Sequence, residues 1–161
     1  MTFPFPAPVI SYSSRLISIP SSRLEKEADM DPEVIENLFT DSTLRNLFPE
    51  EKADLFFDAM YGDVSEGAYD IELSLDGLKS NRLEFHFNLR RRPEKCLACN
   101  LTYGLPHVFS RHPLIDTQGL VNGIEKILNG IAICKEWDLH ETLEISSDLH
   151  VIPLIIKVQA A

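Results

Sequence analysis

The chain has 161 residues, of which 44% are hydrophobic and 25% are charged, and its formal net charge is −10. This length allows one domain with a substantial core, and the acidic balance excludes a general nucleic-acid binder, which needs a basic face to replace phosphate counterions. The longest apolar run, residues 151–156, is interrupted by Pro153 and is far shorter than the stretch of about 20 residues that spans a membrane. The sequence therefore predicts a single domain without a membrane segment.

The first 29 residues differ from the rest of the chain. Four prolines, at positions 4, 6, 8 and 20, exclude a continuous helix there, because each removes a backbone donor and clashes with the preceding turn. Two interpretations stay open: residues 1–29 form a disordered tail, or they are a mis-assigned upstream start and Met30 is the true first residue. In both cases residues 30–161 are predicted to form the domain.

Helical signals dominate residues 31–62. Asp31 is an N-cap candidate followed by proline at the first helical position, and residues 40–48 continue in helical phase. The clearest helix covers residues 49–61 and ends at Gly62. Its apolar residues recur at helical spacing and predict one stripe that faces the core: Ala53, Phe56, Phe57 and Met60.

The hydrophobic period then changes from 3.6 to 2. Residues 69–75 and 82–90 both alternate apolar and polar side chains, which is typical of half-buried strands, and Asp76-Gly77 begins the expected turn of a hairpin. Pairing Asp76 with Arg82 keeps both apolar sets on one face. It also places His86 opposite Glu72, as a surface histidine beside a carboxylate.

Residues 118–129 predict a second long helix, capped by Asp116 or Thr117. Residues 149–158 predict a strand, which Pro153 should restrict to a sheet edge or to a bulge, whereas the arrangement of residues 131–148 stays open. The predicted fold class is α+β, in two layers: an antiparallel sheet of about four strands with helices 49–61 and 118–129 packed on its apolar face.

The stretch "KCLACNLTYGLPHVFSRHP", residues 95–113, concentrates cysteine and histidine at the spacing C-x2-C-x7-H-x4-H. Two thiolates spaced in this way can hold one tetrahedral zinc ion, although the second half does not fit a standard zinc finger. The candidate metal ligands are Cys96, Cys99, His107, His112 and Cys134.

Two other interpretations of this stretch stay open. Cationic residues precede Cys96 and favour a reactive thiolate, which indicates a thiol redox site, but Gly104 and Pro106 are expected to prevent the helix that usually follows such a pair. Alternatively the three cysteines, expected to be reduced, are small buried side chains of the core, in a loop anchored by its aromatic and aliphatic residues.

Charge is unevenly distributed, because residues 25–76 are strongly acidic and residues 77–112 are basic. The basic segment either complements the acidic one within the fold or forms a surface for an anion or a protein partner. The candidate residues for that surface are Arg90, Arg91, Arg92, Lys95, Tyr103 and Arg111.

Three stretches, "LFPEEKADLFFDAMYGDVSEGAYDIEL", "KCLACNLTYGLPHVFSRHPLI" and "LHVIPLIIKV", resemble a group of small uncharacterised bacterial proteins. Members of this group are often mislabelled as pancreas/duodenum homeobox proteins. The resemblance implies a bacterial cytoplasmic protein and a start near Met30, and it implies no activity, cofactor or catalytic residue. The label itself does not fit, because a homeodomain needs a basic recognition helix and this chain has a hairpin and an acidic balance.

The sequence thus favours a small cytoplasmic accessory domain that contacts a protein through residues 90–113. This domain is not expected to be catalytic by itself or to bind nucleic acid or a membrane. The alternative is a zinc-binding or thiol-active protein centred on Cys96 and Cys99.

Overall fold

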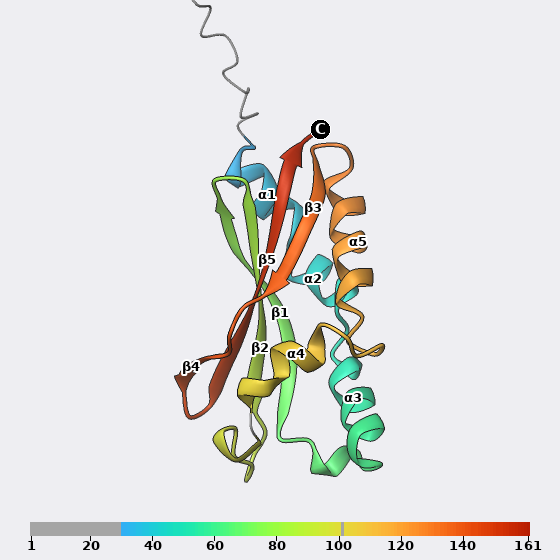
Figure 1. Ribbon diagram of the computed structural model, residues 1–161, viewed down its shortest axis with the longest axis vertical. Coiled ribbons are helices and arrows are strands. Elements are labelled where there is room, and N and C mark those ends of the chain that lie inside the picture. Colours follow the sequence, from blue (N-terminus) through green and yellow to red (C-terminus); the bar gives the residue numbers. More distant parts are fainter. Residues whose placement is uncertain (1–29, 101) are drawn as a thin grey trace, which may run out of the picture.

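The computed structural model describes residues 30–100 and 102–161. The two interpretations of residues 1–29 fall outside these residues. Within them the chain forms a five-stranded antiparallel sheet with helices on one side, so the predicted α+β class is confirmed (Figure 1).

The described residues form five α-helices, and capping residues recognised in the sequence bound three of them. Asp31 accepts a hydrogen bond from the amide of Glu33 at the start of the first helix, and Gly62 ends the third in a left-handed conformation, with φ +72°. The side chain of Asp116 caps the fifth helix through the amide of Gly119. The helices are α1 (Pro32–Leu38), α2 (Asp41–Leu47), α3 (Glu51–Tyr61), α4 (Leu105–Phe109) and α5 (Thr117–Leu128).

The short helix α4 was not expected. Gly104 and Pro106 were predicted to prevent a helix, but Pro106 lies in the first turn of α4, where the amide that proline lacks has no helical acceptor. One expected core residue also differs, since Met60 at the end of α3 is 45% exposed.

The sheet has the strand order β1-β2-β5-β3, and β4 pairs with the same edge of β5 as β3 does. Every pairing is antiparallel. The strands are β1 (Tyr69–Lys79), β2 (Arg82–Arg91), β3 (Ala132–Leu139), β4 (Leu143–Ser146) and β5 (Leu149–Ala160).

The hairpin of β1 and β2 keeps the predicted faces but not the predicted register. Leu73 lies opposite Phe87 rather than Phe85. A shift of two residues leaves every side chain on its own face, so the apolar sets still face the helices. The register moved because the turn consists of Ser80 and Asn81, while Gly77 lies in a β-bulge at φ +141°.

The prediction for Pro153 was wrong, because β5 is a central strand and its pairing with β2 continues through Pro153 without a bulge. The carbonyl of Pro153 accepts a hydrogen bond from the amide of His140. In a strand the N and O of one residue point to the same side, and a hydrogen-bonded antiparallel pair exchanges two bonds, so the missing N–H would have donated back to the carbonyl of His140. Pro153 therefore removes one hydrogen bond, at the point where β3 has ended at Leu139 and β4 has not begun at Leu143.

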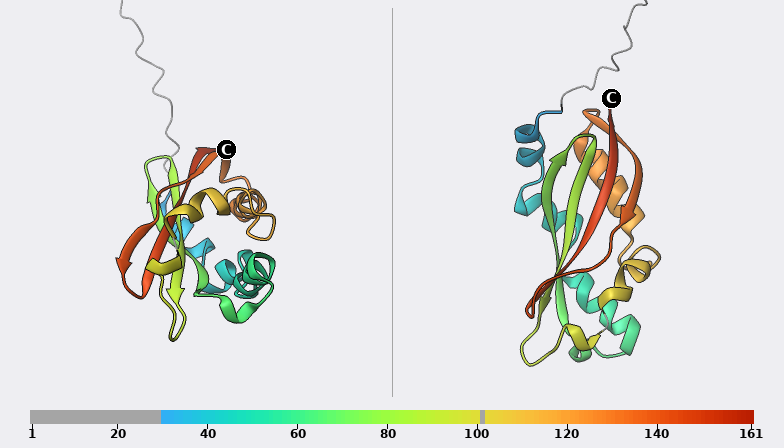
Figure 2. Two further views of the ribbon diagram at one scale, coloured as in Figure 1. Left: turned by 60° about the horizontal axis from the view of Figure 1, so that its bottom comes forward. Right: turned by 60° about the vertical axis from the view of Figure 1, so that its left-hand side comes forward.

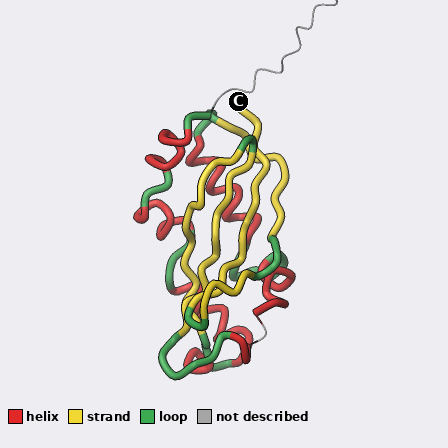
Figure 3. Tube along the Cα trace, turned by 90° about the vertical axis from the view of Figure 1, so that its left-hand side faces the viewer, coloured by secondary structure: helices red, strands yellow, loops and turns green. Residues whose placement is uncertain are grey.

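One face of the sheet is covered by helices and the other is not (Figures 2 and 3). The core lies between the covered face, called here the inner face, and the helices. Aromatic rings join the layers: Phe109 of α4 lies edge-on to Phe87 of β2, with ring centroids 5.5 Å apart, and edge-on to Phe56 of α3, at 5.6 Å. Among the described helices, none has both the length and the apolar character needed to cross a bilayer.

Phe109→Ala should therefore lower the free energy of unfolding by about 3–5 kcal/mol, the usual cost of removing a buried aromatic ring, because Phe109 is fully buried between two layers. Chemical denaturation monitored by circular dichroism measures this. His107→Ala is the matched control on the same helix, since His107 is exposed and its loss should change stability by less than about 0.5 kcal/mol. Equal effects of the two substitutions would contradict the observed packing of α4.

Candidate functional site

The segment from β2 to α5 packs against one end of the inner face. Its buried side chains, Leu97, Leu105, Phe109 and Ile115, are at most 8% exposed, and they fix a path that contains only short helical turns besides α4. The interpretation of this segment as a loop anchored by apolar residues is therefore supported for these positions. Tyr103, a candidate residue of the expected binding surface, is 62% exposed and donates a hydrogen bond to Glu144 of β4.

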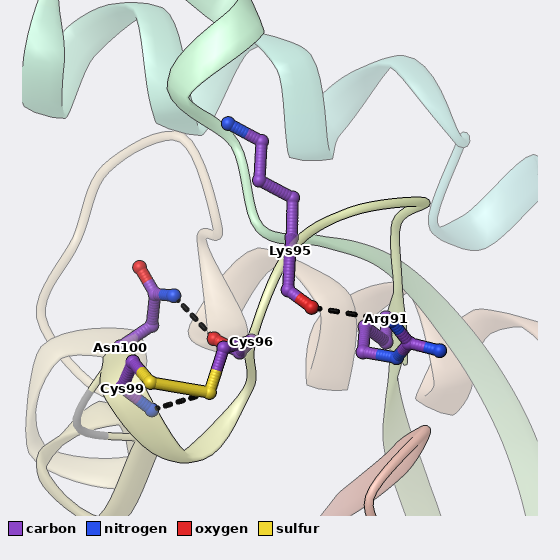
Figure 4. Close-up of a disulfide and its surroundings, with 5 residues drawn as sticks. All are labelled: Arg91, Lys95, Cys96, Cys99 and Asn100. Atoms are coloured by element: carbon purple, nitrogen blue, oxygen red, sulfur yellow. Dashed lines mark hydrogen bonds between the residues drawn. A yellow bond between two sulfur atoms is a disulfide. The ribbon is translucent and has the colours of Figure 1, made fainter.

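Cys96 and Cys99 are bonded to each other in this segment, with their Cα atoms 5.4 Å apart (Figure 4). Both residues are exposed, which contradicts the interpretation that they are reduced side chains buried in the core. The backbone N–H of Cys99 donates to Cys96 Sγ at 3.2 Å, and the side-chain amide of Asn100 donates to the carbonyl of Cys96. The turn at Ala98–Asn100 thus holds the pair in a compact loop and directs an N–H donor at one sulfur atom.

The cationic residues that precede Cys96 are not directed at its sulfur, as the sequence had indicated. Arg91 donates through Nη1 to the carbonyl of Lys95 and forms an ion pair with Asp148. Figure 4 shows the side chain of Lys95 directed away from the disulfide. The N–H of Cys99, and not the ammonium of Lys95, is therefore the donor that acts on the sulfur of Cys96.

A pocket of about 340 Å³ lies beside the pair, and its lining includes Cys96, Leu97, Glu144 and His150. The pocket joins the disulfide loop to the start of β5 and to β4. A chain segment bound there would contact Cys96.

His150 is buried in this region together with Thr102 and Thr142, and 1% of its surface is exposed. Its Nδ1 lies 2.7 Å from the hydroxyl of Thr102, and Thr102 also accepts a hydrogen bond from Thr142 through its carbonyl. The other ring nitrogen, Nε2, is buried without a partner among the described residues. His150 was not predicted from the sequence. The period of two along β5 could have indicated it, because His150 alternates in phase with the inward-facing residues 152, 154 and 156.

The five candidate metal ligands are not brought together in the described part of the chain. Cys134 lies opposite Val158, roughly 26 Å along β5 from His150 at about 3.3 Å per residue. His107 is exposed on α4, and His112 lies edge-on to Phe56, with ring centroids 5.0 Å apart. Among the described residues, no group of three or more side chains close enough to hold one ion includes any of these five.

The three consecutive arginines each have an acidic partner within the chain. Arg90 pairs with Glu72 at 2.6 Å, Arg91 pairs with Asp148, and Arg92 contacts both Asp54 and Asp70. The pairs of Arg90 and Arg92 join the basic segment to the acidic one and favour the interpretation that the two complement each other, whereas Asp148 lies outside the acidic segment. Arg111, the last candidate of the expected surface, is exposed directly after α4.

Cys134 on β3 is the free cysteine of the described residues. Burial, together with the nearby carboxylate of Glu125, raises the pKa of its thiol to about 11. The same carboxylate accepts a hydrogen bond from the backbone N–H of Cys134. Cys134 is thus predominantly a neutral thiol at neutral pH and is distinct from the exposed pair.

No family model, curated protein or solved structure matches this chain.

Alkylation of Cys134 by iodoacetamide should be slow at neutral pH and should accelerate about tenfold per pH unit up to a pH near 11, because the thiolate is the reactive form. Glu125→Gln removes the neighbouring negative charge and should move this profile to lower pH. Mass spectrometry of protein with the Cys96–Cys99 bond intact gives the rates. A profile that levels off near pH 8.5, as for an ordinary cysteine, would contradict the described burial.

Thr102→Val should lower the free energy of unfolding by about 1–3 kcal/mol, because it leaves Nδ1 of the buried His150 without its partner. Denaturant titration measures the change. Thr43→Val is the control, since the hydroxyl of Thr43 makes an exposed hydrogen bond to Thr40, and it should be nearly neutral. Similar stability of the two variants would show that the buried pair is absent.

Proposed function

We propose that this protein is a thiol–disulfide exchange domain in which Cys96 is the attacking cysteine and Cys99 is the resolving cysteine. The observation that carries the proposal is the hydrogen bond from the N–H of Cys99 to Sγ of Cys96, 3.2 Å long, between two exposed residues. A donor directed at sulfur stabilises the negative charge of a thiolate, and the thiolate is the nucleophile in exchange reactions.

The proposed reaction starts from the reduced pair and a disulfide in a protein or peptide substrate. The thiolate of Cys96 attacks one substrate sulfur, so a mixed disulfide forms, the substrate S–S bond breaks, and the released substrate thiolate takes up a proton. Cys99, after losing its proton to solvent, attacks Sγ of Cys96 and releases the second substrate sulfur, which also takes up a proton. Two electrons pass from the cysteine pair to the substrate disulfide.

The position of the pair supports this assignment of roles. Cys96 lines the pocket next to β4, where a substrate chain can approach its sulfur. Cys99 is bonded to Cys96 across the Ala98–Asn100 turn, so it is already within reach for the resolving step, which gains from intramolecular proximity.

The predicted accessory role with a protein partner fits a substrate that is itself a protein. The expected basic contact surface supports this role less strongly, because Arg90, Arg91 and Arg92 form ion pairs within the chain. A cytoplasmic location stays a prediction. It agrees with a reversible pair, because disulfides in that compartment are usually transient and catalytic or redox-sensing.

Cys99→Ser should trap the mixed disulfide on Cys96 when the reduced protein is incubated with a disulfide-bonded model peptide. Cys96→Ser should react at least about tenfold more slowly, because it lacks the sulfur that the hydrogen bond stabilises. A hydrogen bond to a charged group contributes enough free energy for a rate difference of about this size. Mass spectrometry of acid-quenched samples identifies the adducts.

Cys134→Ser is the control and should behave as the parent protein, since Cys134 lies far from the pair. Equal reactivity of the Cys96→Ser and Cys99→Ser variants would contradict the assigned roles. A peptide disulfide left intact by the reduced parent protein would contradict the proposed function itself.

A further inference from the structure

A second polar cluster lies on the uncovered face of the sheet, called here the outer face. It consists of Asp76 of β1 with Glu84 and His86 of β2. Figure 3 looks onto this face and shows the strands in front of the helices. The cluster is therefore separated from the disulfide loop, which packs on the inner face, and it plays no part in the proposed exchange reaction.

The β-bulge creates this cluster. Gly77 is the Cα partner of Glu84, whereas Asp76 is the extra residue at the shift in register. A bulge of this kind redirects a side chain locally. Glu84 and His86 are two residues apart in one strand and so point to the same face. His86 consequently lies beside Glu84 and Asp76, and not beside Glu72 as the sequence indicated.

The donor atoms are already close to one another. Nε2 of His86 is 3.0 Å from Oε1 of Glu84 and 3.9 Å from Oδ1 of Asp76, and one atom from each of the three residues lies within 4.8 Å of the others. Ligands that bind one ion at about 2.1 Å are about 3–3.5 Å apart. Small side-chain movements would thus convert this cluster into a coordination set.

The ammonium group of Lys79 already occupies part of this site. Nζ of Lys79 lies 2.8 Å from Oδ2 of Asp76 and 3.1 Å from Oε2 of Glu84. Asp76 and Glu84 are carboxylates at neutral pH and can act as ligands, and Lys79 competes with any metal ion for them.

We propose that Asp76, Glu84 and His86 form a binding site for a divalent transition-metal ion, of which Zn²⁺ is the representative. One imidazole nitrogen with two carboxylate oxygens suits Zn²⁺ better than Mg²⁺, which prefers oxygen ligands alone. Three protein ligands leave a coordination position open. The neighbouring hollow of about 750 Å³, lined in part by Lys79 and Glu84, gives space for water or a small ligand there.

Isothermal titration with Zn²⁺ tests the proposal on the full chain without a histidine tag, in a Cys134→Ser background with the Cys96–Cys99 bond intact. These conditions remove thiol ligands from the titration. Loss of a residue that only positions a metal ligand already weakens metal binding about tenfold or more. His86→Ala and Asp76→Asn remove a ligand itself and should each weaken Zn²⁺ binding by at least about as much. Circular dichroism confirms that each variant is folded.

Lys79→Ala distinguishes a metal site from an ordinary ion-pair cluster. It should tighten Zn²⁺ binding by about fivefold, because it removes a competing positive charge close to both carboxylates. His107→Ala is the matched control, an exposed histidine outside the cluster, and should leave binding unchanged.

Three results would overturn the proposal. These are equal Zn²⁺ affinity of the His86→Ala and His107→Ala variants, no gain in affinity from Lys79→Ala, and binding of Mg²⁺ as tightly as Zn²⁺. Each can occur while the exchange reaction at Cys96 proceeds normally, so the two proposals fail independently.

Discussion

The packing of Phe109 between the sheet and α3 is the contact on which the rest of the structure depends. The chain has to cross from the end of β2 to the start of α5 over the inner face, and it does so with little regular structure. Phe109 fixes this crossing by contacting Phe87 and Phe56 at once. Because Leu97 is buried in the same segment, the turn that carries Cys96 and Cys99 is attached to the core although both cysteines are exposed. The candidate site is thus a surface loop on a rigid base.

Much of the fold could be predicted from the sequence because its signals are local. Period-2 alternation, helix caps and the stripe of α3 each depend on neighbouring residues, and they predicted β1, β2, β5, the helices other than α4, and the common apolar face. The position of β5 could not be predicted in the same way. A central strand with Pro153 is acceptable only because β3 ends and β4 begins on either side of it, and that arrangement depends on long-range pairing.

The candidate site was predicted in part. The spacing of Cys96 and Cys99 indicated chemistry, but the residues that approach them depend on how the segment folds back. His150 reaches the region from the far end of the sequence, whereas Cys134 was assigned to it and lies at the other end of the sheet. The hydrogen bond that distinguishes Cys96 from Cys99 comes from the Ala98–Asn100 turn. A motif search detects the spacing of the cysteines but not the geometry of this turn.

Cys96 and Cys99 are proposed to form a reversible pair. The most direct measurement is to equilibrate the protein in glutathione buffers of increasing oxidised fraction, alkylate the free thiols and count them by mass spectrometry. We expect both thiols of the pair to disappear together as an internal disulfide forms, while Cys134 stays free. A pair that stays reduced in fully oxidised glutathione, or two cysteines that each take up a separate glutathione, would show that Cys96 and Cys99 do not form a reversible disulfide.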